Sequence, residues 1–200
     1  SIDRFYNNID PASVIEELIA ISSPKKNDKI IFVWPEGILP GISQEQIIEY
    51  DWLFKDKFNE NHLIIIGINS KLNENQTTKY FNSFSVYNHN LELINSYNKI
   101  NLVPFGEFLP FERILKKTGF KTITKGYRSY SRGLERNVIN IKEKNFSLKI
   151  LPLICYEIIY SGRIFKNVDF DFIINISEDG WFGQSIGPKQ HFIHSIYRAI

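Results

Sequence analysis

Three residues with complementary chemistry each follow the end of an expected β-strand: Glu36, Lys99 and Cys155. A cysteine thiolate can attack a carbonyl carbon, and a carboxylate can take the proton of the thiol. An ammonium group can stabilise the oxyanion that this attack creates. If the fold brings the three side chains together, they suit nucleophilic acyl transfer through a thioester.

The reactivity of Cys155 depends on how easily its thiol loses a proton. A free thiol has a pKa of about 8.5, and a cation, a nearby base or a helix N-terminus lowers that value. We expect a helix beginning near Glu157 to lower the pKa of Cys155 in this way. Each residue also fits an ordinary role when taken alone: core packing for Cys155, a loop carboxylate for Glu36 and a surface ammonium for Lys99.

Composition favours one globular domain over residues 1–200, with 43% hydrophobic residues. The 24 basic and 22 acidic residues are scattered and give a net charge of +2, which argues against a nucleic-acid partner. The single cysteine excludes an internal disulfide framework and a cysteine-based zinc site. His191 and His194 share one face of an expected helix, but no third ligand motif accompanies them, so we predict no metal.

The chain alternates between expected strands and helices. The expected strands, by apolar runs and turn residues, are 29–34, 63–69, 80–87, 91–97, 138–141, 146–154 and 170–177. The expected helices begin at Asp10-Pro11, at Ser43-Gln46 (through Phe58), near 158–165 and at Pro188. Residues 101–133, rich in glycine, proline and aromatic side chains, predict an irregular excursion.

This pattern predicts an α/β fold with mixed sheets, in which strand ends can bring distant side chains to one edge. The longest apolar runs are far shorter than the roughly 18 residues needed to cross a bilayer. No secretory signal opens the sequence. Because both ends look abrupt, we expect a fragment of a longer protein.

Four segments, in order, carry a resemblance to a known family. They read FVWPEGILPG at 32–41, YNKINLVPFGEFLPFE at 97–112, LICYEIIY at 153–160 and NISEDGWFGQSIGPKQHF at 175–192. They resemble the nitrilase domain of bacterial apolipoprotein N-acyltransferases, a branch of the carbon-nitrogen hydrolase superfamily. The resemblance covers most of the chain.

The resemblance implies an αββα sandwich, here truncated at both ends. It implies that Glu36 is the general base, Lys99 the electrostatic stabiliser and Cys155 the nucleophile, with Glu107 as a second functional glutamate. The other residues that it implies for the pocket are Tyr156, Glu157 and Trp181. At Glu178 the family more often has asparagine, so we expect different hydrogen bonding in that loop.

The implied reaction moves a fatty acyl chain from a phospholipid, through a Cys155 thioester, to the N-terminal amine of a diacylglyceryl-cysteine lipoprotein, without a cofactor. It implies a place on the periplasmic face of the bacterial inner membrane, reached through a missing segment or a companion chain. Six apolar residues of the excursion could line the acyl chain or simply pack it down: Phe105, Phe108, Leu109, Phe111, Ile114 and Leu115.

Two other hypotheses about the function stay open. The generic Glu-Lys-Cys order also fits a soluble amidase or nitrilase that acts on small molecules. The missing ends also fit an inactive remnant or a binding module.

Overall fold

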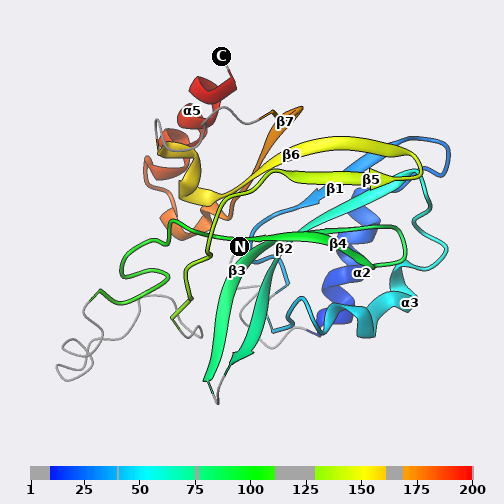
Figure 1. Ribbon diagram of the computed structural model, residues 1–200, viewed down its shortest axis with the longest axis horizontal. Coiled ribbons are helices and arrows are strands. Elements are labelled where there is room, and N and C mark those ends of the chain that lie inside the picture. Colours follow the sequence, from blue (N-terminus) through cyan, green and yellow to red (C-terminus); the bar gives the residue numbers. More distant parts are fainter. Residues whose placement is uncertain (1–9, 40, 75–76, 111–128, 161–168, 200) are drawn as a thin grey trace.

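Two mixed β-sheets form the centre of the protein in a computed structural model that describes residues 10–39, 41–74, 77–110, 129–160 and 169–199 (Figure 1). The first sheet has the order β1-β2-β3-β4, with β1 parallel to β2 and the other neighbours antiparallel. The second has the order β5-β6-β7, with β5 antiparallel and β7 parallel to β6. The strands are β1 (Ile30–Trp34), β2 (His62–Glu74), β3 (Thr77–Tyr87), β4 (Leu93–Asn98), β5 (Ile139–Glu143), β6 (Phe146–Ile154) and β7 (Phe172–Ile176).

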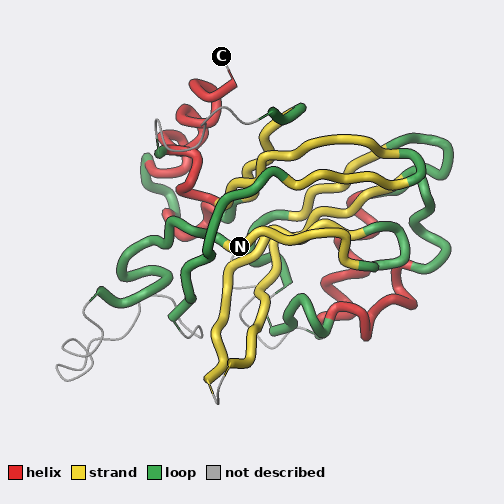
Figure 2. The backbone as a smooth tube through the Cα atoms, in the orientation of Figure 1, coloured by secondary structure: helices red, strands yellow, loops and turns green. Residues whose placement is uncertain are grey.

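Helices cover the outer face of the first sheet and one end of the second (Figure 2). The α-helices are α2 (Pro11–Ser22), α3 (Asp51–Phe54) and α5 (Gly187–Ala199). The 3-10 helices are η1 (Ile47–Tyr50), η3 (Cys155–Ile159) and η4 (Asp179–Phe182). The expected α/β class with mixed sheets is confirmed.

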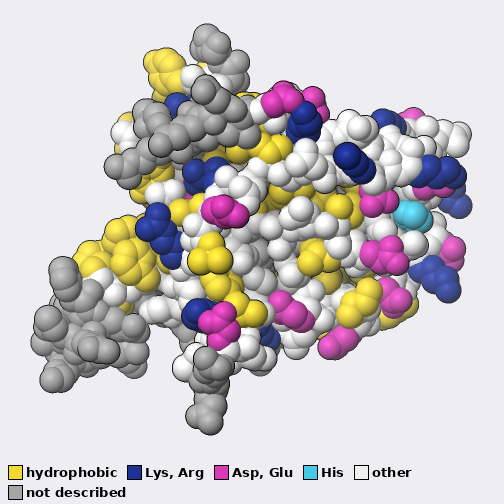
Figure 3. Space-filling model, viewed as in Figure 1, with side chains coloured by type: hydrophobic (Ala, Val, Ile, Leu, Met, Phe, Trp, Pro, Cys, Tyr) yellow, Lys and Arg dark blue, Asp and Glu magenta, His cyan; other side chains and the backbone are white. Residues whose placement is uncertain are grey.

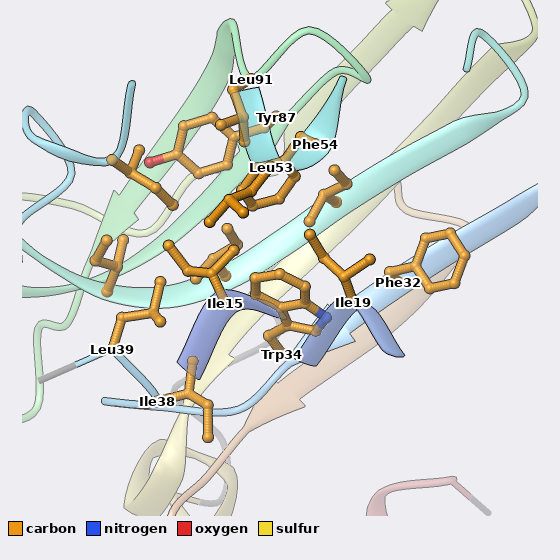
Figure 4. Close-up of a cluster of buried hydrophobic side chains, with 14 of the residues drawn as sticks. Ile15, Ile19, Phe32, Trp34, Ile38, Leu39, Leu53, Phe54, Tyr87 and Leu91 are labelled. Atoms are coloured by element: carbon orange, nitrogen blue, oxygen red, sulfur yellow. The ribbon is translucent and has the colours of Figure 1, made fainter. Parts of the chain in front are cut away.

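The first part of β2, up to Ile68, is buried on both faces because its side chains alternate between two hydrophobic clusters. Ile64 and Ile66 point to the cluster shared with α2 and α3, while Leu63 and Ile65 point to the cluster between the sheets. Figure 4 shows the first cluster, in which Ile15 of α2 and Phe54 of α3 close over the sheet. Each such burial stabilises the fold by about 1.5–3 kcal/mol, so the strand ends are held on a rigid core.

The helix expected from Ser43 through Phe58 is wrong in length. Gln46 does reach back to the amide of Ser43 at 3.1 Å, but Ser43 itself pairs with Asn69 as an isolated bridge. Only η1 and α3 follow, and Asp56 then turns the chain with a φ of +65°. The bridge at Ser43 and the left-handed turn at Asp56 therefore bound a helical segment that the apolar spacing alone predicts as longer.

The helix expected near 158–165 is also different. Residues 155–159 form the 3-10 helix η3, which begins at Cys155 itself, and residues 161–168 lie outside the described part. Strands β1, β4, β5 and β6 match the expected elements closely. Strand β2 runs on to Glu74, beyond the expected end at 69, and β3 begins at Thr77 rather than at 80. Among the described residues, no helix is both long and apolar enough to cross a membrane.

Candidate active site

Glu36 lies just beyond the end of β1, where the chain passes over Gly67 of β2. A Cβ atom at Gly67 would lie 2.5 Å from the Cα of Glu36, so only glycine permits this close approach. Gly37, with a φ of +62°, then turns the chain away. These two glycines leave the largely buried Glu36 carboxylate at the end of the sheet.

Lys99 follows β4 and is 1% exposed. Its Nζ donates to Glu36 Oε1 at 3.1 Å and to Glu107 Oε1 at 3.0 Å. Burial by itself would lower the pKa of Lys99, but the charges of Glu36 and Glu107 outweigh burial and raise that pKa above its ordinary value. Lys99 is therefore a fixed cation at neutral pH.

Glu107 brings the irregular excursion into the same cluster. Its Oε2 accepts from the amide of Val103 at 2.8 Å, and its backbone carbonyl accepts from the amide of Tyr130 at 2.8 Å. The two described ends of the excursion thus meet at this residue. Of the six apolar residues expected beside the acyl chain, Leu109 is buried, Phe108 is half-buried and Phe105 is 47% exposed. The other three, Phe111, Ile114 and Leu115, lie outside the described part.

Asn82 of β3 completes the charge cluster, and sequence reasoning missed it. Its Nδ2 donates to Glu36 Oε1 at 2.6 Å and to Glu107 Oε1 at 2.8 Å. One side-chain amide and one ammonium group therefore hold two buried carboxylates together, which offsets the cost of removing these charges from water. The available signal was an asparagine next to aromatic residues in the buried part of a strand.

Cys155 follows β6 and has a left-handed backbone, with a φ of +51°. Burial and the charge of Glu36 raise the pKa of its thiol to about 12, and the charge of Lys99 offsets only part of this rise. The expectation of a lowered pKa is wrong, because the buried carboxylate and the loss of solvent outweigh the cation. At neutral pH the side chain of Cys155 is therefore a protonated thiol.

Glu157 is fully buried and ties the segment of Cys155 to the segment of Lys99. Its carboxylate oxygens accept from the Tyr97 hydroxyl (2.7 Å), the amides of Ile100 and Asn101 (both 3.0 Å), Arg136 Nη2 (2.6 Å) and the amide of Ile154 (3.0 Å). Burial and the charge of Glu157 raise the pKa of Tyr97, so its hydroxyl keeps the donated proton. Glu157 therefore joins the backbone before Cys155 to the backbone after Lys99.

Tyr156 and Glu178 contact other residues of the site. Tyr156 stacks on the ring of His191, with ring centroids 5.9 Å apart. The amide of Glu178 donates to Glu36 Oε2 at 3.2 Å, and its side chain accepts from the amide of Gly180. Trp181 lies in η4, and its side chain is outside the described part.

His191 is buried, whereas His194 on the same helix is exposed. Ligand atoms of Cys155, Asp179 and His191 lie within 4.8 Å of one another, a grouping within the described part of the chain that local sequence spacing did not reveal. The first two are far apart in the sequence, and folding alone brings them together. The absence of a metal stays a prediction.

A carboxylate, a cation and a thiol thus share one end of the two sheets, and the charges of Glu36 and Lys99 both act on Cys155. The family model for carbon-nitrogen hydrolases matches residues 11–200. The chain belongs to the carbon-nitrogen hydrolase family. The resemblance of its four ordered segments is thereby confirmed at the level of the family.

Its relatives within the family carry a narrower name. Proteins named apolipoprotein N-acyltransferase are 32% identical over 97% of this chain in Rhizobium leguminosarum bv. trifolii, and 33% identical over 85% in Caulobacter vibrioides. The matched regions are 37% and 33% of those proteins, so the chain spans about a third of the length of the relatives it matches.

Solved structures show the same fold. A glutamine-dependent NAD+ synthetase from Acinetobacter baumannii has a TM-score of 0.55 at 18% identity, over 94% of this chain and 32% of that one. A carbon-nitrogen hydrolase from Helicobacter pylori has a TM-score of 0.51 at 14% identity, over 92% of this chain and 59% of that one. At such identities the likeness establishes the nitrilase-type fold alone.

Proposed function

We propose that this chain is the catalytic part of an apolipoprotein N-acyltransferase. It would transfer a fatty acyl group from a phospholipid to the N-terminal amine of a diacylglyceryl-cysteine lipoprotein. The observation that carries the proposal is the hydrogen-bonded cluster of Glu36, Lys99 and Glu107, in which the charges of Glu36 and Lys99 act on the Cys155 thiol. The name of the relatives at 32–33% identity supports this reaction over others in the family.

In the first half-reaction, Glu36 takes the proton of Cys155 as Sγ attacks the ester carbonyl of the phospholipid. A raised thiol pKa suits this timing, because the proton leaves only when the carboxylate and the substrate are both in place. Lys99 holds the oxyanion of the tetrahedral intermediate. The C–O bond then breaks, Glu36 returns the proton to the leaving lysophospholipid oxygen, and a thioester remains.

In the second half-reaction, the lipoprotein amine attacks the thioester carbonyl and forms the new C–N bond. Glu36 accepts a proton from this amine and delivers it to Sγ as the C–S bond breaks, which restores the thiol. No cofactor enters the balance. The reaction would take place at the periplasmic face of the inner membrane, where a further segment or a companion chain would supply the membrane contact.

The test uses the full-length protein in vesicles that contain a phospholipid with a radiolabelled acyl chain. The expected result is label on Cys155 as a hydroxylamine-sensitive thioester, followed by loss of that label to an added diacylglyceryl-cysteine peptide. The Cys155→Ala variant should take up no label. A wild-type protein that never forms the thioester, or one that turns over small amides without any lipid, would overturn the proposal in favour of a soluble hydrolase.

A further inference from the structure

Helix α5 lies against η3, the short helix that begins at Cys155, and contacts η3 at both ends (Figure 1). At the start of η3, Nε2 of His191 lies 2.9 Å from the backbone carbonyl oxygen of Cys155. At the end of η3, Nε of Arg198 donates to the carbonyl of Ile158 at 3.0 Å. A single helix therefore fixes the short segment that carries the thiol.

Both ring nitrogens of His191 face oxygens that accept hydrogen bonds. The carbonyl of Cys155 can only accept, so Nε2 must carry a proton. Nδ1 lies 2.8 and 3.0 Å from the two oxygens of Asp179, and Oδ1 of that carboxylate already accepts from the Ser177 hydroxyl at 2.5 Å. A further proton therefore lies between Nδ1 and Asp179, and this hydrogen bond joins the two side chains.

The surroundings of His191 keep its ring in one orientation. The ring is stacked on Tyr156 at an interplanar angle of 21°, and the Tyr156 ring packs in turn against Phe182 at a centroid distance of 6.2 Å. The His191 side chain is 4% exposed, whereas that of Asp179 is 29% exposed. The ring is therefore locked by stacking on one side and by the carboxylate at its edge.

The held carbonyl belongs to a residue in an unfavourable conformation. A non-glycine residue with a φ of +51° costs about 1–2 kcal/mol and persists only where neighbouring groups fix it. This left-handed turn sets the direction in which the thiol of Cys155 leaves the end of β6, toward the charges of Glu36 and Lys99.

We propose that Asp179 and His191 are a positioning pair, in which the carboxyl group of Asp179 holds the imidazole ring and the ring N–H holds the Cys155 carbonyl so that the turn stays left-handed. Both side chains lie within 4.8 Å of Sγ, but the hydrogen bond that His191 makes to Cys155 in the described structure goes to the backbone carbonyl and not to the thiol. The kinetic test below rests on the proposed thioester chemistry, while the structural test does not.

Three substitutions in the full-length protein separate this role from simple packing. His191→Leu removes the donor to the carbonyl, and Asp179→Ala removes the group that fixes the ring. Asp179→Asn should rescue, because its amide can donate to the unprotonated Nδ1 of a neutral imidazole. His194→Leu, on the exposed face of the same helix, is the matched control.

The kinetic readout is the burst of nitrophenol released when Cys155 is acylated by a p-nitrophenyl ester of a short fatty acid. The burst rate should fall on the order of 100-fold in His191→Leu and about 10-fold in Asp179→Ala, as expected for a misdirected nucleophile. It should stay within about threefold of wild type in Asp179→Asn and in the control. If His191→Leu and Asp179→Ala both fold and both keep the wild-type burst rate, the proposal is overturned. If His191→Leu does not fold, the burst rate of Asp179→Ala decides.

The structural readout is the backbone of Cys155 in a crystal structure of Asp179→Ala or His191→Leu. We expect Cys155 to leave the left-handed region or to become disordered. An unchanged turn would overturn the positioning role. A wild-type protein without any burst would count against the proposed function alone, because the conformation of the turn is measured without it.

Discussion

The backbone amide of Lys99 donates to the carbonyl of Asn82 at 2.9 Å, and the side chains of the same two residues donate to the same two carboxylates. The pairing of β3 with β4 thus sets the spacing of the two donors. Glu36 and Glu107 come from segments far apart in the chain and meet on this pair. The register between β3 and β4 therefore places the two donors where they can bind both carboxylates.

Asn82→Asp should disable the site. The substitution replaces a donor shared by Glu36 and Glu107 with a third carboxylate, and like charges at such distances repel strongly in a buried environment. We expect a loss of unfolding free energy of about 2–3 kcal/mol and loss of thioester formation. Denaturant melts and acyl labelling measure both, with Asn95→Asp on the exposed face of β4 as control.

Glu36→Gln should change two reactions of Cys155 in opposite directions. Removing the carboxylate charge takes away one cause of the raised thiol pKa, so alkylation by iodoacetamide near pH 9 should become faster. Acylation by substrate should become slower by about 100-fold or more, because the general base is lost. Glu49→Gln, which is exposed, should change neither rate. Slower alkylation would show that Glu36 does not act on the thiol as a charge.

The raised thiol pKa also predicts how stability depends on pH. The folded state keeps the Cys155 proton up to a pH of about 12, whereas an unperturbed thiol loses it near pH 9.0. Between these values the folded state binds more protons, so its unfolding free energy falls as pH rises, by at most about 1.4 kcal/mol per pH unit. Below this window the contribution is complete. The difference between wild type and Cys155→Ala, measured by denaturant melts across the window, should show this slope, and a flat difference would contradict it.

Gly67→Ala and Gly133→Ala should each displace a candidate catalytic residue. The added Cβ would lie 2.5 Å from the Cα of Glu36 in the first variant and 2.1 Å from the carbonyl oxygen of Asn98, next to Lys99, in the second. Backbone atoms must move in both cases, at a cost of about 1–3 kcal/mol. We expect acyl labelling to be lost in both variants. Gly106→Ala is the control, because its Cβ would meet Val103 only at 3.5 Å.

Glu157→Gln should weaken the link between the two halves of the site. The amide removes the negative charge that partners Arg136 and places a donor where a carboxylate oxygen accepts from a backbone amide. Breaking one partner of a buried ion pair typically costs about 3–5 kcal/mol. The melting temperature should fall clearly, while Glu135→Gln on the exposed surface should leave it unchanged. Equal melting temperatures would mean that the Arg136 ion pair contributes little.

Sequence reasoning predicted the elements that carry the chemistry. The apolar run before Pro35 predicted the strand that presents Glu36, and the run before Cys155 predicted β6. Both predictions succeeded because burial and β-branched side chains act locally. The helix expected after Ser43 is shorter than predicted, because Ser43 pairs with Asn69, which lies far along the chain. Charged side chains of both signs are interspersed on the face shown in Figure 3, in line with the nearly balanced composition.

By itself, the order of residues determined the family, the two-sheet fold and the places where Glu36, Lys99 and Cys155 leave their strands. Only the tertiary structure decided the state of those groups: the bridging role of Asn82, the cation at Lys99 and the raised pKa of the thiol. The physical reason is that strand formation depends on neighbours in the chain, whereas charge and burial depend on neighbours in space. For a buried carboxylate, ammonium or thiol, those neighbours come from segments that no local spacing can reveal.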